Sequence, residues 1–357
     1  MKAVVLVGGE GTRLRPLTLT TPKQMLPVVE QPMIERVLGQ LAPHGVDHAV
    51  LSLGYRPDAF LNAYPDGVVA GVAVTYAVEP TPLDTAGAVR FAAVHAGVDA
   101  TFVVVNGDVL ADLDLDELVR FHRDRGGVAT IALTPVADPS AFGVVPTDAS
   151  GRVTAFIEKP RRDQAPTNLI NAGTYVLEPS VLDRIASGRR VSIEREVFPA
   201  LVADGQLYAQ ASDTYWLDTG TPERYLQAHL DVLAGLRPEV TLPSHVERDG
   251  LLLGEDAQFE GVLRGRAFCS AASRVEHGAE LENSIVCEHV CIESGARLVE
   301  SVVLEGARVV AGAVVERSIV GPRAVVGAAA RLSSLSVVGV GYEVPAGVHL
   351  DSARLPE

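Results

Sequence analysis

Short apolar runs alternate with segments of helical periodicity over the first 236 residues. The runs with strand character are residues 3–7, 49–53, 72–78 and 101–105. After Pro32, apolar side chains recur at i, i+3, i+4 and i+7, which predicts a helix that begins at that proline. These apolar positions are Ile34, Val37, Leu38 and Leu41. With a second helix expected over residues 86–96, the alternation predicts an α/β fold: a Rossmann-like, doubly wound and mostly parallel sheet with helices on both faces.

The pattern changes past Arg237-Pro238, where helical periodicity ends. From Gly250 onward the chain consists of β-rich units of about six residues, punctuated by glycines. The recurring apolar positions include Val275, Leu281, Ile292, Leu298, Val309, Val315, Ile319 and Val325. Hexapeptide spacing favours a parallel β-helix over a β-sandwich, whose strands alternate over longer units. We therefore expect two domains, a catalytic domain over residues 1–236 and a linker with a β-helix over residues 237–357.

Charge and hydropathy limit the possible partners. The formal net charge is −15, so the chain is a poor candidate for binding nucleic acid or an anionic membrane surface. A polyanionic ligand would need a local basic pocket. No run is long enough to span a bilayer, and the apolar start breaks at Gly8, too early for a signal peptide.

The cysteines are three, an odd number that suggests no disulfide framework. They are Cys269, Cys287 and Cys291. Residues 287–291 (CEHVC) could look like half of a metal site, but a second half with suitable spacing is missing from the sequence. Small buried cysteines in the coil corners are the favoured interpretation. Such cysteine usage indicates a reducing compartment, so we expect a cytoplasmic protein.

The first apolar run ends in the glycine-rich residues 8–11, and three basic side chains follow. Glycines let the main chain approach a pyrophosphate and turn N–H groups toward it. Arg13, Arg15 and Lys23 add positive charge. Lysine occurs only at positions 2, 23 and 159, and a flexible ammonium suits a phosphoryl oxygen that moves during reaction. The alternative is a turn that merely connects two elements; the basic residues favour a phosphate-binding loop.

Two aspartates are candidate metal ligands. Asp108 follows the strand-like run 101–105, and ligands of a doubly wound sheet lie at the carboxyl ends of its strands. A carboxylate there can hold Mg²⁺ against phosphates. Asp218, in a glycine-flanked bend, can supply a second ligand. The alternative for Asp108 is an Asx-turn, since Asn-Gly-Asp is common turn chemistry.

A third group of polar residues suits a sugar phosphate. Gly143 lies in a short strand and lets a ligand approach the backbone. Glu158 and Asn171 offer hydrogen-bonding groups for vicinal hydroxyls, and Lys159 can hold the phosphate of the sugar. The alternative for each is surface turn polarity.

The opening loop resembles the signature of the sugar-phosphate nucleotidyltransferases. Gly8 to Thr18 read GGEGTRLRPLT, and Pro22-Lys23 follow. Glu158-Lys159-Pro160 and Asn171-Ala172-Gly173 also match that superfamily. Residues 192–199 and 216–220 look most like its mannose-1-phosphate guanylyltransferase branch. Members of that branch carry a C-terminal left-handed β-helix, so the resemblance extends over nearly the whole chain.

The resemblance implies transfer of GMP from GTP to mannose 1-phosphate, assisted by Mg²⁺, with release of pyrophosphate. It implies catalytic roles for Arg13, on the leaving pyrophosphate, and Lys23, on the α-phosphoryl group. The implied nucleotide-binding residues are Leu6, Gly8, Gly9, Gly11, Thr12, Glu79, Asp84, Thr85 and Gly107. The implied sugar-phosphate residues are Gly143, Glu158, Lys159 and Asn171. Asp108 and Asp218 are the implied metal ligands.

The nucleobase is expected to lie beside residues 79–87. Guanine presents two donors, N1 and N2, to which a carboxylate such as Glu79 can hydrogen-bond, whereas thymine and uracil suit an amide better. Asp84 stands where the family pattern has glycine, and Gln24 where proline is usual after Lys23. The base preference therefore stays open between guanine and a pyrimidine.

Alternative functions differ in class. The nearest is a glucose-1-phosphate thymidylyl- or uridylyltransferase. A second is a regulatory subunit that binds sugar nucleotide without turnover; the presence of both basic catalytic residues and both aspartates argues against it. A third is an acyltransferase in the β-helix, where His277, His289 and His349 have no evident partner in the sequence. The exposed backbone edges of a β-helix also predict a homo-oligomer.

Overall fold

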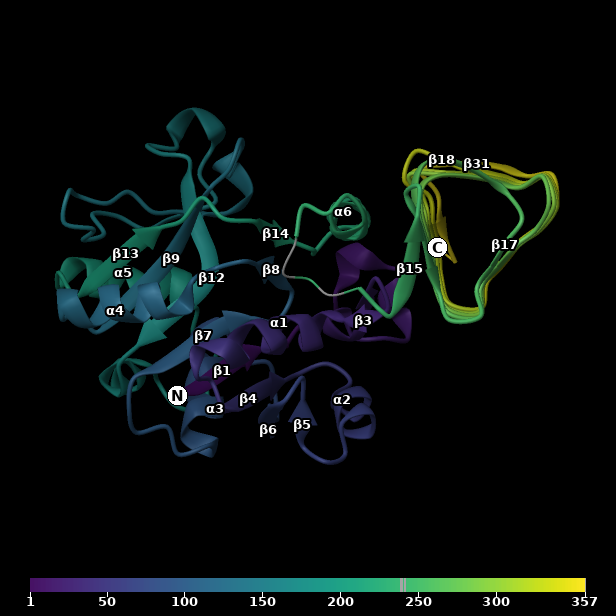
Figure 1. Cartoon of the computed structure of the whole chain (residues 1–357). Helices are drawn as coiled ribbons and strands as arrows, with labels where there is room; N and C mark the ends of the chain where they lie inside the picture. Colours follow the sequence, from purple (N-terminus) through teal and green to yellow (C-terminus); the bar gives the residue numbers. More distant parts are fainter. Residues whose placement is uncertain (238–239, 241, 357) are drawn as a thin grey trace. The chain divides into compact units, whose positions relative to one another are not determined.

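The computed structural model of the chain describes residues 1–237, 240 and 242–356 (Figure 1). The chain forms two compact units, and neither is one stretch of sequence. The first contains Met1–Gly9 and Ile34–Leu217, and the second contains Glu10–Met33 and the chain from Asp218 onward. The loop after the first strand thus belongs with the C-terminal part. The domain boundary after residue 236 stays a prediction, and Pro238 beside it lies outside the described residues.

The first unit is built on a ten-stranded sheet. The strand order is β11-β10-β12-β7-β1-β4-β6-β5, with β9 paired to β12 and β13 to β9. Four strands confirm the predicted apolar runs: β1 (Lys2–Leu6), β4 (His48–Leu53), β6 (Val72–Val78) and β7 (Phe102–Asn106). These four are parallel neighbours, in the order β7-β1-β4-β6.

The remaining strands make the sheet mixed. β12 (Leu169–Leu177) is antiparallel to both β7 and β9 (Ala129–Pro135), whereas β13 (Leu207–Ala211) is parallel to β9. The shorter strands are β5 (Val68–Val69), β8 (Val109–Ala111), β10 (Gly143–Val144), β11 (Ile157–Glu158) and β14 (Trp216–Asp218). β8 and β14 form a separate two-stranded sheet.

Helices cover this sheet. They are α1 (Met33–Leu41), α2 (Pro57–Ala63), α3 (Asp84–His95), α4 (Leu115–Arg125) and α5 (Phe198–Ala203). α3 packs on β1, β4 and β6, and α4 packs on β9, β12 and β13. α1 buries Ile34, Leu38 and the other apolar positions of the predicted stripe. The helix starts at Met33, however, because Pro32 is paired with Pro27 in a hairpin; the prediction of a start at Pro32 is wrong by one residue.

The second unit begins with the loop Glu10–Met33. Three 3₁₀ turns occupy Thr12–Leu14, Leu17–Leu19 and Lys23–Met25. The hairpin β2 (Pro27–Val28) and β3 (Gln31–Pro32) follows. After the first unit, α6 (Pro222–Leu233) starts the C-terminal part. The Thr221 hydroxyl caps that helix by accepting the Arg224 N–H at 3.3 Å, and Pro222 is the first helical residue, which confirms the predicted start.

The rest of the second unit is a coiled array of short strands. Figure 1 shows the coils stacked end-on as a triangular ring. Parallel partners lie 17 residues apart in the central coils, as in the ladder Leu281, Leu298 and Val315. The arrangement is consistent with the predicted left-handed β-helix. The apolar positions of the hexapeptide pattern are buried except at one point: Val325 is only half-buried and Val326 takes the buried place, so the predicted register is off by one there.

The strands of this array are numbered β15 to β32. They are β15 (His245–Arg248), β16 (Leu251–Gly254), β17 (Gln258–Phe259), β18 (Val262–Cys269), β19 (Arg274–Val275), β20 (Glu280–Val286), β21 (Cys291–Ile292), β22 (Arg297–Val299), β23 (Val302–Val303), β24 (Arg308–Val309), β25 (Val314–Glu316), β26 (Ile319–Val320), β27 (Val325–Val326), β28 (Arg331–Ser333), β29 (Val337–Val338), β30 (Glu343–Val344), β31 (His349–Asp351) and β32 (Arg354–Leu355).

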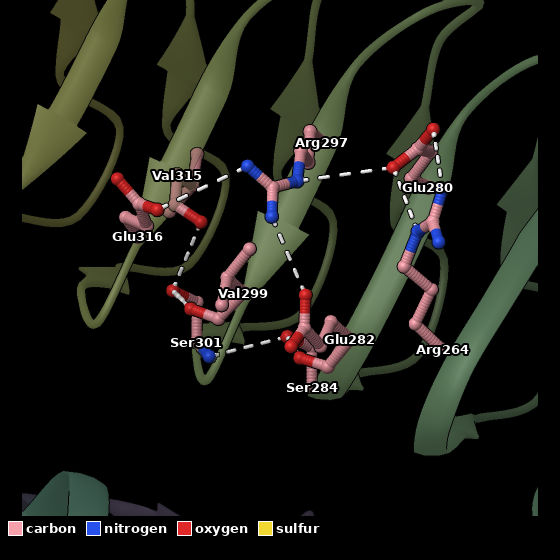
Figure 2. Close-up of polar contacts among 9 residues, drawn as sticks. All are labelled: Arg264, Glu280, Glu282, Ser284, Arg297, Val299, Ser301, Val315 and Glu316. Carbon is pink, nitrogen blue, oxygen red and sulfur yellow. Dashed lines mark hydrogen bonds and ion pairs between the residues drawn. The ribbon is translucent and has the colours of Figure 1, made fainter.

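Two polar ladders run across the coils (Figure 2). In the interior, the Ser301 N–H donates to the Ser284 hydroxyl at 3.2 Å. One coil further on, the Ser318 N–H donates to the Ser301 hydroxyl at 3.1 Å. On the surface, the Arg297 guanidinium lies between three carboxylates, at 3.8, 3.3 and 4.0 Å. These belong to Glu280, Glu282 and Glu316. The serines satisfy buried backbone donors at the coil corners and so fix the coil register.

The cysteines are free thiols, as expected from the sequence. Cys269 and Cys287 are buried in the β-helix, and Cys291 is half-buried. Burial raises the pKa of the Cys269 thiol to about 12, so this thiol stays protonated and unreactive near neutral pH. Among the described helices, none is both long and apolar enough to cross a membrane.

Candidate active site

The predicted phosphate loop starts at the carboxyl end of β1. Gly8 and Gly9 are exposed there, and Gly9 has φ +106°, a conformation that favours glycine. Leu6 is half-buried against the core. Gly107, at the end of β7, donates its N–H to the Leu6 carbonyl at 2.9 Å. A Cβ on Gly107 would lie 2.7 Å from Val7 Cγ1, so this glycine allows the close packing of β1 and β7.

The loop continues in the second unit, where it brings Gly11 and Lys23 together. Gly11 has φ +60°, and its carbonyl accepts the Thr18 hydroxyl at 2.8 Å. A Cβ on Gly11 would be 3.2 Å from Lys23 Cβ and 3.0 Å from Thr18 Cγ2. Any larger residue would push these side chains apart. Thr12 and Arg13 occupy the following 3₁₀ turn with exposed side chains, which leaves both able to meet a ligand.

Arg13 and Asp218 converge on Gly220, also in the second unit. Asp218 ends β14 and accepts the Gly220 N–H at 2.8 Å. A Cβ on Gly220 would be 2.7 Å from Arg13 Nη2 and 2.8 Å from Asp218 Oδ1. The guanidinium and the carboxylate therefore flank the same backbone position. Asp108, the other predicted metal ligand, is half-buried and directly precedes β8.

Glu79 is fixed at the end of β6 in the first unit. Its Oε1 accepts the Ser52 hydroxyl at 3.0 Å, and its Oε2 accepts the Leu83 N–H at 3.0 Å. A Cβ on Gly8 would lie 3.8 Å from Glu79 Oε1, so this carboxylate borders the phosphate loop. Each carboxylate oxygen has a second lone pair, which leaves acceptor capacity for a ligand.

Asp84 explains why the family pattern has glycine at its position. Its φ is +61°, a left-handed conformation that glycine adopts without strain and that aspartate tolerates better than most residues. The side chain accepts the N–H of the adjacent Thr85 at 2.9 Å and lies 3.9 Å from Arg190. The substitution therefore keeps the backbone turn and adds a carboxylate at the surface.

Thr85 connects residues 79–87, the segment predicted to lie beside the nucleobase, to the start of the π-helix Ile193–Val197. Its hydroxyl donates to Glu194 Oε2 at 2.7 Å and accepts the Ile193 N–H at 2.8 Å. Ser192 donates to the same Glu194 oxygen at 2.8 Å. Backbone bonds from residues 86 and 87 to the Val191 carbonyl strengthen the link. Thr85 thus has a structural role in addition to its predicted contact with the nucleotide.

Gly143 and Glu158 face each other as a register pair of β10 and β11. A Cβ on Gly143 would lie 2.6 Å from the Phe156 ring and 3.2 Å from Glu158 Oε2, so glycine is required by packing. Lys159, which follows, is exposed and lies 3.7 Å from Glu158 Oε1. The structure therefore brings together three of the four predicted sugar-phosphate residues.

Asn171 is held in a defined orientation on β12. Its Nδ2 donates to the Tyr175 hydroxyl at 2.8 Å, and its Oδ1 accepts the Gly173 N–H at 2.9 Å. The β12–β9 pairing is irregular between Asn171 and Tyr175, and Gly173 there has φ +78°. A Cβ on Gly173 would collide with Asn106 Nδ2 at 2.6 Å. The irregular pairing and these two hydrogen bonds fix the orientation of the Asn171 side chain.

Glu194 lies beside the predicted site residues Thr85 and Glu158, although the sequence did not single it out. Burial raises the pKa of Glu158, and the Glu194 carboxylate raises it further, while Lys159 and Arg195 lower it. Glu194 also adds to the raised pKa of Tyr175, which comes mainly from burial. Two carboxylates and a lysine therefore share one polar region of the first unit. The Ser192-Ile193-Glu194 motif was the available signal, but nothing local ties it to Glu158.

Carboxylate oxygens are the ligand atoms that Mg²⁺ prefers, so the side chains of Asp108 and Asp218 are of a suitable type to bind a divalent cation. Another acidic cluster, His44, Asp114 and Asp116, lies in the first unit with its ligand atoms within 4.8 Å of one another. Its members already have structural roles. Asp114 caps α4 by accepting the Glu117 N–H, and the His44 imidazole is hydrogen-bonded to Asp116 at 2.9 Å.

Comparison with known families covers both units. The family model described as Nucleotidyl transferase matches residues 2–235. The chain belongs to the nucleotidyl transferase family. A second model, described as GMPPB C-terminal domain, matches residues 263–356. Nucleotidyl transferases of this family generally use a divalent metal.

Relatives of this nucleotidyl transferase carry a consistent name. Mannose-1-phosphate guanylyltransferase of Mycobacterium tuberculosis is 41% identical over 298 residues, which cover 82% of this chain and 81% of that protein. Mannose-1-phosphate guanylyltransferase 1 of Arabidopsis thaliana is 39% identical, over 82% and 85%. Among solved structures, HddC from Yersinia pseudotuberculosis complexed with GMP-PN is 28% identical, with a TM-score of 0.56, covering 65% of this chain and 99% of that one.

Proposed function

We propose that the protein transfers GMP from GTP to mannose 1-phosphate and releases GDP-mannose and pyrophosphate. One observation carries the proposal: relatives named mannose-1-phosphate guanylyltransferase are 37–41% identical over 81–82% of the chain. A matched stretch of that length necessarily includes the sugar-phosphate residues Gly143 to Asn171. The presence of Arg13, Lys23, Asp108 and Asp218 supports turnover rather than silent binding.

The proposed reaction is an in-line displacement at the α-phosphorus of GTP. A phosphate oxygen of mannose 1-phosphate forms the new P–O bond, and the bond from the α-phosphorus to the α,β-bridging oxygen breaks, so pyrophosphate leaves. The enzyme forms no covalent bond, and catalysis is positioning and charge neutralisation. Arg13 stabilises the leaving pyrophosphate and Lys23 the α-phosphoryl group. Mg²⁺, held by Asp108 and Asp218, would neutralise phosphate charge when bound.

The substrates are proposed to be held by the residues described above. Gly8, Gly9, Gly11 and Thr12 wrap the phosphates, and Leu6 and Gly107 border the nucleotide. Glu79 accepts the two donors of guanine, and Asp84 and Thr85 complete the base segment. The sugar phosphate contacts Gly143, Glu158, Lys159 and Asn171. The hydrogen bonds to Glu79 and Asn171 within the protein support this part, because they orient both side chains before a substrate binds.

The setting of the reaction is also a proposal. We infer a cytoplasmic enzyme. The free thiols suit a reducing compartment, and the proposed substrate GTP is available in the cytoplasm. We further infer a homo-oligomer that forms through the β-helix, whose terminal coils end in open strand edges.

A pyrophosphate-release matrix tests the substrate assignment. GTP, dTTP, UTP, ATP and CTP are each paired with mannose, glucose and N-acetylglucosamine 1-phosphates, and initial rates are compared. GTP with mannose 1-phosphate is expected to give the highest kcat/KM. A strong preference for dTTP or UTP with glucose 1-phosphate would overturn the substrates but keep the reaction. Lack of pyrophosphate release from every pair by folded protein would overturn the transferase proposal.

A further inference from the structure

The turn between β2 and β3 has an unusual sequence for its conformation. Val28 pairs with Gln31, so Val29 and Glu30 form a two-residue turn with φ +46° and +68°. Turns of this kind favour Asn-Gly, because both central residues need positive φ. A β-branched residue in this region is a true outlier. Such strain persists only where the surroundings hold the residues in place, and it concentrates at functional positions.

The surroundings of the turn are α6 and the β-helix, all within the second unit. The Val29 N–H donates to His229 Nδ1 at 3.2 Å, and the Tyr225 hydroxyl donates to the Pro27 carbonyl. Val29, Tyr225 and His229 are fully buried. The Tyr225 and His229 rings pack edge to face at 4.8 Å. The base of the hairpin is therefore locked to the helix.

The tip of the hairpin lies against the β-helix. The Glu30 carboxyl is near the Ser270 hydroxyl, the Glu288 backbone and the carboxylates of Glu288 and Glu305. Its Oε1 is buried and has no hydrogen-bond partner among the described residues. A carboxylate next to two others, with one buried oxygen that has no hydrogen-bond partner, lowers the stability of the folded state. Stability therefore does not explain why a glutamate occupies this position.

The same segment carries the basic residues of the phosphate loop. Lys23 lies in the 3₁₀ turn directly before the hairpin, and Arg13 precedes it on the loop. A second contact joins the loop to the last coils: a Cβ on Gly339 would lie 3.0 Å from Pro16 Cβ. The Thr219 hydroxyl, next to Asp218, also donates to Met33 Sδ at 2.9 Å. Both ends of the segment are thus fixed by the C-terminal part of the chain.

We propose that Val29 and Glu30 form a positioning turn through which the β-helix holds Arg13 and Lys23 in their reactive placement. This inference rests on the proposed function. The β-helix then positions the catalytic residues, in addition to its proposed role in oligomer formation. The strained turn, in which Val29 is buried and Glu30 half-buried, transmits the placement because it cannot shift without losing its contacts to α6 and to the coils.

The test uses Glu30→Gly in the full chain, with Glu300→Gly as the matched control. Glu300 is also a glutamate at positive φ, +44°, but it lies in a coil corner away from the loop. Both changes relieve backbone strain, so neither is expected to lower Tm. Glu30→Gly should reduce kcat by on the order of tenfold, with KM for both substrates changed less than about threefold. Glu300→Gly should leave kcat unchanged.

Hydrogen exchange supplies a readout that does not depend on activity. Amides of Glu10–Met33 should exchange faster in Glu30→Gly and at the wild-type rate in Glu300→Gly. Unchanged kcat and unchanged exchange in Glu30→Gly overturn the positioning role. If Glu30→Gly does not fold, Ser270→Leu disturbs the same contact from the β-helix side and is judged by the same criteria. A wild-type protein without turnover overturns the proposed function, whereas the exchange comparison still decides the coupling.

Discussion

Two single residues, Asp84 and Glu30, adopt backbone conformations that are unfavourable for a residue with a side chain. Asp84 stands at a glycine position of the family and keeps the left-handed backbone at φ +61°. Glu30 combines positive φ with a half-buried carboxyl group. Neither cost is visible in hydropathy, because both arise from backbone geometry and surroundings. Both can be measured by substitution.

Asp84→Gly is expected to stabilise the fold by about 0.5–1 kcal/mol, because glycine adopts positive φ without steric cost. Chemical denaturation of the full chain measures the change. Asp99→Gly is the control: Asp99 is an exposed loop aspartate without positive φ, so glycine there should give no gain. Equal effects at both positions would show that strain at Asp84 is negligible.

Glu30→Gln should raise Tm at pH 8 and lose that advantage near pH 4. Burial, together with Glu288 and Glu305, raises the pKa of Glu30 above its usual 4.5. The charged wild-type carboxylate therefore costs stability above the raised pKa, and this cost disappears as the pH falls below 4.5. Thermal melts from pH 4 to pH 8 follow the difference. Glu343→Gln, at an exposed β-helix position, should show no difference at either end.

At the scale of elements, the coils of the β-helix depend on buried polar contacts more than on surface charge. The Ser301 hydroxyl donates to the Val299 carbonyl at 2.7 Å and accepts the Ser318 N–H at 3.1 Å in the interior. Arg297 lies among three carboxylates but is 43% exposed, so water screens its ion pairs. The two ladders in Figure 2 therefore differ in energetic weight.

Ser301→Ala is expected to cost about 1–3 kcal/mol, because it leaves the buried Ser318 N–H without its acceptor. Arg297→Ala should cost less than about 1 kcal/mol. Urea denaturation of both variants, read by far-UV circular dichroism, gives the comparison. A larger loss for the arginine variant would mean that the surface ladder sets the coil register.

For the whole molecule, the division of the chain into two units assigns the proposed catalytic groups to different parts. Glu158, Asn171 and Asp108 belong to the first unit, whereas Arg13 and Lys23 belong to the second. Removal of one charged side chain that acts on the substrate phosphates should cost a few kcal/mol of transition-state stabilisation without unfolding either unit.

Lys23→Ala and Asp108→Ala are each expected to reduce kcat at least about 100-fold while circular dichroism and Tm stay near wild-type values. Lys2→Ala is the matched control. The Lys2 ammonium donates to the Ala96 and Gly97 carbonyls, both at 2.9 Å, and has no proposed role in the reaction. Near-normal turnover of either active-site variant would contradict the mechanism.

Removal of divalent metal with EDTA should stop pyrophosphate release, and added Mg²⁺ should restore it. Asp218→Asn should shift the Mg²⁺ concentration needed for half-maximal rate upward by about tenfold or more, since it removes one ligand charge. The Mg²⁺ titration of initial rates measures the shift. Full activity in EDTA would exclude the metal from the reaction.

The sequence by itself determined the elements and most of the chemistry, because both depend on local pattern. Strand-like runs such as 72–78 became strands, the units of about six residues indicated the β-helix, and the glycine-rich residues 8–11 with the resemblance indicated the family. Dependence on local pattern also explains where the sequence-based predictions are wrong. Pro32 entered a hairpin instead of starting a helix, and Val326 replaced Val325 in the core, because partners distant in sequence decide pairing and register.

Only the tertiary structure decided which distant residues act on one another. Glu194 affects Glu158 because the β10–β11 pair and the π-helix are brought together by the sheet. The segment after β1 joined the C-terminal unit because the Val29–Glu30 turn is buried against α6 and the β-helix, about 200 residues away along the chain. Such contacts gain their energy from burial and geometry between remote segments, which no local pattern encodes.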